Sequence, residues 1–221
     1  KNAMPPCQIR RLLSLVKSIN PAESNPVFWI DTLCVPLDDH YRKVAISRFQ
    51  DTYREATKVL VLDRSLAQVG CNNRPEQIAH LLCSEWMSRL WTLQEGLLAK
   101  SLLIKFKDEI VPLNDLLGKD TVERNAPRTD IVEMKLRSQL ASRFLLHDQF
   151  GAVLDENEFS RRPDAPFLAL MQNLQRRRTT KPKDEPICLA TLLDIDLKQF
   201  PKMPSMEDIY RTKGKLPVNL I

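Results

Sequence analysis

The chain has 221 residues, of which 43% are hydrophobic, and its 33 basic and 28 acidic residues leave a net charge of +5. This composition supports a real core and excludes a low-complexity chain. The balance of charges favours a soluble surface over a dedicated nucleic-acid binder, which usually concentrates its charge. No apolar run reaches the roughly 18 residues that a membrane span needs. The five cysteines and three histidines are scattered. They predict free thiols, no metal site and a cytoplasmic location.

Apolar patterns in the first half predict alternating helices and strands. The chain opens at Lys1 without an initiator Met, so we expect further sequence upstream. Apolar residues at helical spacing, or in short continuous runs, predict these elements in order: a helix over 7–20, a strand over 27–30, a helix over 38–57, a strand over 58–63, a helix over 84–99 and a strand over 101–106. Strands that are apolar throughout and alternate with helices predict a parallel sheet with helices on both faces.

The alternation ends after residue 107. The next stretch predicts a turn and a short helix over 108–117, and longer helices follow over 130–150, 165–180 and 184–195. We therefore predict two parts, a core over 1–107 and a helical C-terminal lobe over 108–221 that packs on it.

Two carboxylates follow predicted strands. Asp31 ends the first strand and Asp63 ends the second. Ligands bind at the carboxyl ends of parallel strands, so both are candidate ligand-binding residues. A role in a turn or a helix cap is an equally good interpretation. Asp38 or Asp39 is better placed to cap the next helix.

The predicted helix over 84–99 has two different faces. Trp86, Leu90, Leu93 and Leu97 form one stripe, which we expect to face the sheet, while Trp91 and Glu95 lie nearly opposite. One interpretation has the C-terminal lobe covering Trp91, with Glu95 paired to an arginine of that lobe. The other has a cleft with Trp91 as its wall and Glu95 as a base or a partner of ribose hydroxyls. Residue types alone favour the first.

Several chemistries have no signature here. The chain contains no glycine-rich phosphate loop and no nucleophile elbow. The cluster Arg176–Arg178 with Lys181 and Lys183 has no interleaved aromatic residues, which favours a solvated helix end over a nucleic-acid patch.

Three blocks resemble the signature of the fungal heterokaryon-incompatibility (HET) domain family. They are "FWIDTLCVPLDD", "YRKVAISRFQDTYREATKVLVLD" and "SEWMSRLWTLQEGLLAK", and the third matches the family pattern Trp-x-x-Arg-x-Trp-x-x-Gln-Glu through Trp86, Arg89, Trp91, Gln94 and Glu95. The stretch "TTKPKDEPICLATLL" is similar to one that follows the domain in many members. The opening strand typical of the family is not in this sequence; either it lies upstream of Lys1 or this member lacks it.

The resemblance implies a TIR-like or flavodoxin-like parallel sheet and a role in fungal non-self recognition and programmed cell death. It implies self-association and a sensor or incompatibility protein as partner, and no required cofactor. Trp91 and Glu95 are similar to a box on a TIR helix whose glutamate supports NAD cleavage. The alternative is therefore a TIR-like hydrolase of NAD or a related nucleotide, with Glu95 as the catalytic residue and, as ligand-binding residues, Asp31, Asp63, Arg89, Trp91 and Gln94. Binding of a nucleotide without turnover is a third hypothesis.

Overall fold

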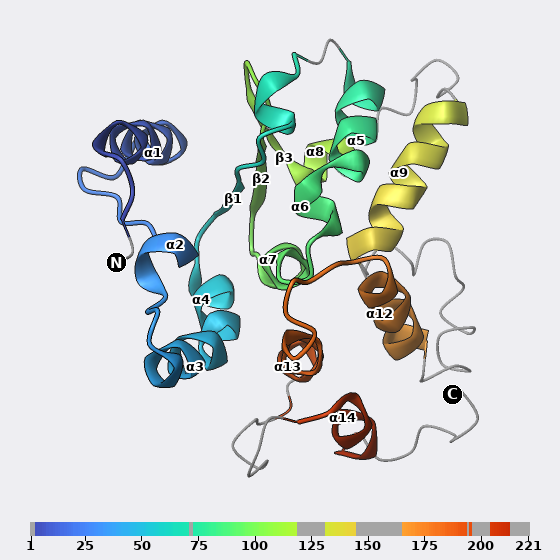
Figure 1. Ribbon diagram of the computed structural model, residues 1–221. Coiled ribbons are helices and arrows are strands. Elements are labelled where there is room, and N and C mark those ends of the chain that lie inside the picture. The colour runs from blue at the N-terminus through green and yellow to red at the C-terminus, as the bar shows by residue number, and fades with distance from the viewer. Residues whose placement is uncertain are drawn as a thin grey trace. The chain divides into compact units, whose positions relative to one another are not determined.

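The computed structural model describes residues 3–70, 73–118, 131–144, 165–193, 195 and 204–212 (Figure 1). The chain forms two compact units, Lys1–Phe49 and Gln50–Ile221. The predicted boundary at residue 107 stays a prediction.

The first unit is helical. Its helices are α1 (Pro6–Ile19), α2 (Asp31–Cys34) and α3 (Asp39–Ser47), and α4 (Phe49–Glu55) begins at its last residue. The predicted helix over 7–20 is confirmed as α1, which starts at a proline and ends where the Asn20 amide Nδ2 donates to the Val16 carbonyl at 3.1 Å. Asp38 caps α3 by accepting a hydrogen bond from the Tyr41 backbone N–H at 3.2 Å.

Two predictions for this unit are wrong. Residues 27–30 form no strand; the chain is extended at Ile30 and turns directly into α2. Trp29 instead lies edge-on to Phe49, with ring centroids 5.5 Å apart. The predicted helix over 38–57 is divided at Arg48 into α3 and α4.

The second unit contains a three-stranded sheet in the order β1-β2-β3. Strands β1 (Val59–Val61) and β2 (Leu102–Lys105) are parallel and confirm the strands predicted over 58–63 and 101–106. The third strand, β3 (Ile110–Pro112), is antiparallel to β2. The all-parallel sheet is therefore wrong, because only a short turn joins β2 to β3 and such a turn can connect only antiparallel strands.

Helices η1 (Leu66–Gln68), α5 (Arg74–Cys83), α6 (Glu85–Ser88), α8 (Leu113–Leu117) and α9 (Ile131–Phe144) pack on this sheet. The sheet and these helices together bury a first hydrophobic cluster, which consists of Val61, Leu66, Ile78, Leu81, Trp86, Met87, Leu102, Ile104, Phe106, Val111, Leu113, Leu116, Leu140 and Phe144. Asn73 caps α5, and Gly118 ends α8 with a left-handed φ of 75° that suits glycine. The predicted short helix is confirmed as α8.

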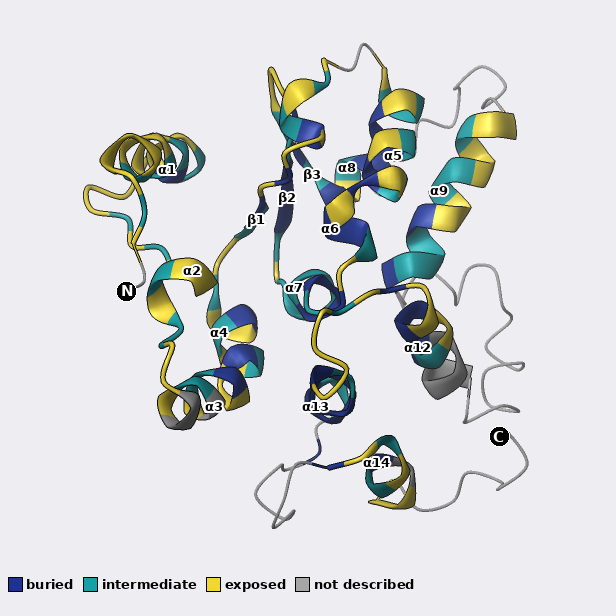
Figure 2. Ribbon diagram, in the orientation of Figure 1, coloured by how far each residue is buried: buried dark blue, intermediate teal, exposed yellow. Residues whose placement is uncertain are grey.

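A second cluster joins α7 (Thr92–Leu98) to the C-terminal helices α12 (Ala165–Gln175), α13 (Asp184–Leu192) and α14 (Met206–Thr212). Its buried members are Leu90, Leu93, Leu170, Leu174, Cys188, Leu189, Ala190, Ile195 and Ile209. Most of α13 is buried (Figure 2). The fold is thus mixed α/β with a small mixed sheet and C-terminal helices, which confirms the broad class that the sequence predicts. Among the described helices, none is long and apolar enough to span a bilayer.

Candidate functional site

The helix predicted over 84–99 is interrupted, and the interruption is where the C-terminal part of the chain joins the rest. The Arg178 backbone N–H donates to the Ser88 carbonyl at 2.6 Å, and the Arg178 carbonyl accepts from the Leu90 N–H at 2.9 Å. A parallel bridge thereby pairs Arg178 with Arg89. In a continuous helix, Ser88 and Leu90 would use these groups within the helix itself. The continuous helix is wrong because Arg178 takes them.

The interruption also divides the predicted apolar stripe. Trp86 belongs to the first cluster, with the sheet, whereas Leu90 and Leu93 belong to the second, with α12 and α13. Leu97 packs against both clusters. The expectation that Leu90 and Leu93 face the sheet is therefore wrong. The chain turns between α6 and α7, and these leucines are buried by the C-terminal helices instead.

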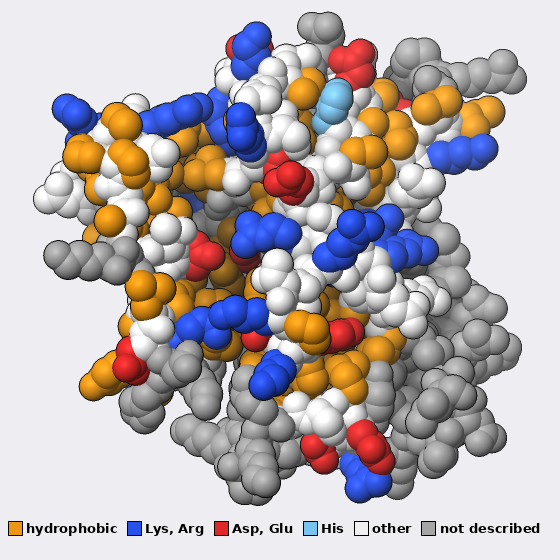
Figure 3. All heavy atoms as spheres, viewed as in Figure 1, with side chains coloured by type: hydrophobic (Ala, Val, Ile, Leu, Met, Phe, Trp, Pro, Cys, Tyr) orange, Lys and Arg blue, Asp and Glu red, His pale blue; other side chains and the backbone are white. Residues whose placement is uncertain are grey.

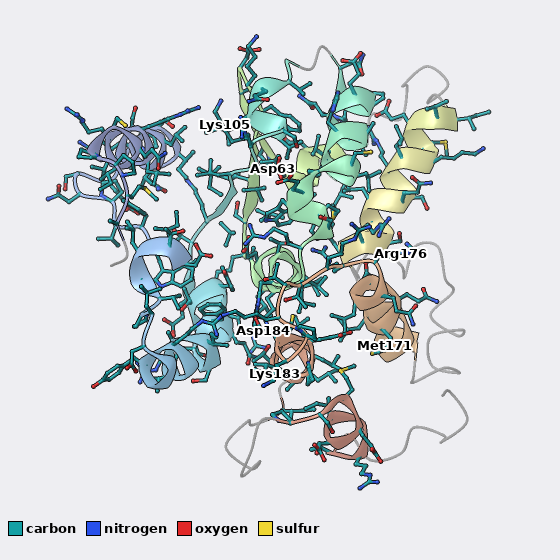
Figure 4. All side chains as sticks on the ribbon, in the orientation of Figure 1. Asp63, Lys105, Met171, Arg176, Lys183 and Asp184 are labelled. Carbon is teal, nitrogen blue, oxygen red and sulfur yellow. The ribbon has the colours of Figure 1, made fainter. Side chains whose placement is uncertain are left out.

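Two polar side chains of α7 and its N-cap bind α13. Gln94 is fully buried, and its amide Nε2 donates to the Cys188 carbonyl at 3.2 Å and to the Thr191 hydroxyl. The Trp91 indole N–H donates to the carboxylate of Asp184 at 3.0 Å, and Asp184 is labelled in Figure 4. The C-terminal helices thus cover part of this indole, which agrees with the structural interpretation of Trp91. The ligand-binding roles of Trp91 and Gln94 stay predictions.

Trp86 connects the two carboxylates that the sequence singles out in this unit. Its backbone N–H donates to Asp63 Oδ2 and its indole N–H donates to Glu95 Oε2, both at 2.8 Å. Glu95 is half-buried. Arg177 of the C-terminal part is near enough for its charge to interact with that of Glu95. The indole contact orients the carboxylate, and catalysis by Glu95 stays a prediction.

Arg177 is a buried side chain that binds the residues between α6 and α7. Its side chain is only 8% exposed. Its guanidinium donates to the Arg89 carbonyl at 3.0 Å and to the Thr92 hydroxyl at 2.8 Å. Burial lowers the pKa of Arg177 to about 10, so the group stays charged at neutral pH. The Thr92 hydroxyl in turn donates to the Trp86 carbonyl. Arg177 and Thr92 therefore supply donors for carbonyls that the interrupted helix leaves open.

Asp63 is saturated by hydrogen bonds. Oδ1 accepts from the Ser65 N–H at 2.8 Å, the Ser65 hydroxyl at 2.5 Å and the Leu66 N–H at 3.2 Å, while Oδ2 accepts from Trp86. Burial by itself raises the pKa of Asp63, but these hydrogen bonds outweigh it and hold the pKa below its ordinary value. The geometry supports the turn interpretation of Asp63, just before η1, over a ligand-binding one.

Replacing Asp63 by Asn should lower the free energy of unfolding by about 1–3 kcal/mol, because an amide cannot accept four hydrogen bonds. The depressed pKa means that the native protein holds this stabilisation above the ordinary pKa of Asp and loses it as the pH falls through the depressed value. Urea unfolding at pH 7 and at pH 3 measures both effects. We expect the gap between wild type and Asp63→Asn to narrow at the lower pH; a constant gap would contradict the assignment.

The remaining candidates lie apart from these contacts or at their edge. Asp31 is in the first unit, where its exposed carboxylate accepts from the Thr32 backbone N–H at 2.6 Å. Arg89 is exposed beside Arg178. Five of the candidate residues therefore lie in the second unit: Asp63, Arg89, Trp91, Gln94 and Glu95. Asp31 lies in the first unit. Among the described residues, no three His, Cys, Asp or Glu side chains are grouped to hold a metal ion.

Sequence reasoning missed the partners of these residues: Arg177, Asp184, Cys188 and Thr191. All lie in or next to the stretch "TTKPKDEPICLATLL", whose likeness to a family segment was the available signal. The sequence predicted that the C-terminal lobe could cover the third block, but it did not indicate which residues of that lobe would make the contact. Comparisons of the chain with protein-family models, with curated proteins and with solved structures found no significant match.

Proposed function

We propose that this chain is a HET-like signalling module that acts in fungal non-self recognition and programmed cell death. One observation carries the proposal. The third block and the stretch around residues 177–191, which independently resemble parts of that family, bind each other through Gln94, Trp91 and Arg177. Two segments that contact each other directly are expected to occur together in one family, so their joint presence supports the likeness more than either does alone.

The contacts suit a module that changes shape when a partner binds. Besides the buried residues of the second cluster, a few directional hydrogen bonds hold α13 to α7, and a backbone bridge holds Arg178 to Arg89. A sensor protein or a second copy that pulls on the C-terminal helices would break these bonds together. Such a joint is the two-state element that a switch needs. A distant TIR-like relationship of the α/β body is part of the same proposal.

An NAD hydrolase is the second candidate, because the Trp86 indole orients Glu95 and the cationic Arg177 is nearby. A half-buried, oriented carboxylate could hold ribose hydroxyls and stabilise an oxocarbenium-like charge. In that case nucleotide loss would itself be the signal for death.

Induced expression in a filamentous fungus separates the two candidates. The proteins to compare are the wild type, Glu95→Gln and Trp91→Phe, with survival as one measurement and nicotinamide release from NAD by the purified proteins as the other. Trp91→Phe keeps a ring but removes the donor to Asp184. We expect the wild type and Glu95→Gln to kill equally without releasing nicotinamide, and Trp91→Phe to alter the surviving fraction.

Two outcomes would count against the signalling proposal. If the wild type, verified as folded and expressed, kills no cells, the proposal fails. If Glu95→Gln abolishes both killing and nicotinamide release while its melting temperature is unchanged, the hydrolase takes its place.

A further inference from the structure

Several arginines lie near the end of α12, where the chain contacts the residues between α6 and α7. Arg177 reaches the Arg89 carbonyl, and the Asn173 amide of α12 donates to the Ser142 carbonyl at 3.0 Å, which brings the end of α9 to the same place. Figure 3 shows Lys and Arg side chains on this part of the visible face, and Figure 4 locates Arg176 there. The arginine cluster consists of Arg89, Arg143, Arg176, Arg177 and Arg178.

Two members of the cluster are placed side by side by the backbone itself. Arg89 and Arg178 are partners in a parallel bridge, which sets their Cα atoms about 5 Å apart with both side chains on one face. Both side chains are exposed. Like charges directly opposite each other destabilise a bridge. Among the residues that the structure describes, neither guanidinium has a carboxylate within ion-pair distance.

The other members add to the positive charge. Burial lowers the pKa of Arg143, and the charge of Arg176 lowers it further. The charge of Arg143 also lowers the pKa of Arg177, while the charges of Cys188 and Glu95 act in the opposite direction. Repulsion of this kind within one small region favours a bound anion, because one multiply charged group offsets several cations at once.

We propose that the arginine cluster binds a small anion with two adjacent phosphoryl groups, held chiefly by Arg89 and Arg178. Guanidinium groups match phosphate oxygens with paired N–H donors, and the bridge sets two of them at a spacing that one diphosphate can span. Single-stranded nucleic acid is less suitable, because it needs aromatic platforms for stacking. Trp86 is buried, and the Trp91 indole is engaged by Asp184. The site is independent of the proposed signalling role.

Calorimetric titration of the full chain with inorganic pyrophosphate tests the site, with melting temperature as a second measurement. We expect the double variant Arg89→Gln/Arg178→Gln to weaken binding at least about ten-fold, because two charge-assisted pairs are lost. Its backbone bridge is unaffected, and its melting temperature without ligand should equal or exceed that of the wild type. The matched control, Lys105→Gln/Lys107→Gln, removes two charges at the end of β2 and in the turn after it and should bind as the wild type does.

Three results would overturn the proposal. The first is no binding to the wild type. The second is equal loss of affinity in both double variants, which would mean general screening of the net charge. The third is tight binding of single-stranded RNA that pyrophosphate cannot displace, which would make the cluster a nucleic-acid site instead.

Discussion

Leu93→Asp should lower the free energy of unfolding by at least about 4 kcal/mol and detach the C-terminal helices from α7. Leu93 is fully buried in the second cluster, between α7 and the helices α12 and α13. A carboxylate there loses the apolar contacts of the leucine and is buried among apolar side chains. Urea unfolding followed by circular dichroism measures the change. Limited proteolysis should then cut the variant first in the C-terminal helices.

The comparison variants separate burial from charge. Leu62→Asp places the same carboxylate at a leucine that is 44% exposed and should cost less than about 1 kcal/mol. Leu93→Asn loses the same apolar group without adding a charge and should fall between the two. If Leu93→Asp were as stable as Leu62→Asp, the assignment of Leu93 to the second cluster would be wrong.

Local patterns predicted the elements whose stability comes from neighbouring residues. The apolar spacing of α1 and the stop at Asn20-Pro21 were sufficient to predict that helix. The apolar runs of β1 and β2 were equally clear. The apolar run at 27–30 gave a wrong prediction. An apolar run becomes a strand only if a neighbouring strand pairs with it, and hydropathy does not report pairing. The three-residue β3 is too short to show a pattern.

The third block shows why a correct periodicity can give a wrong face. Its spacing fits one helix, but Arg178, almost ninety residues further on, replaces the hydrogen bonds that would continue it. Leu90 and Leu93 were correctly predicted to be buried, since any stripe of leucines must be. Which element buries them depends on where the chain returns, and that is decided by contacts distant in sequence.

The candidate site was predictable to a similar extent. Unusual residue types drew attention to Trp91, Gln94 and Glu95, and each of them makes a specific hydrogen bond. Their partners could not be named, because a buried Gln or an indole N–H needs an acceptor without specifying which one. Arg177 belonged to a cluster predicted as a solvated helix end. Instead, its side chain is buried, while Arg176 and Arg178 are exposed.

Trp86→Ala should lower the free energy of unfolding by about 3–5 kcal/mol, because it empties the centre of the first cluster. The indole is 4% exposed and stacks on Phe144 with ring centroids 6.0 Å apart. The two rings close over Gly96, where an added Cβ would lie 2.6 Å from Phe144 Cε1. Helix α7 approaches this closely only because residue 96 has no side chain. The cavity left by alanine would therefore loosen α9 as well as α6.

Trp86→Phe isolates the polar part of this contribution. It keeps an aromatic ring on Phe144 but loses the N–H that binds Glu95, and we expect a loss of about 1–3 kcal/mol. Combining it with Glu95→Leu in a double-mutant cycle should give a coupling of at least about 0.5 kcal/mol. Trp29→Ala, at an indole 37% exposed, is the control for truncation and should cost less than Trp86→Ala. A zero coupling would mean that the indole does not hold Glu95, and the orientation on which a hydrolase depends would be lost with it.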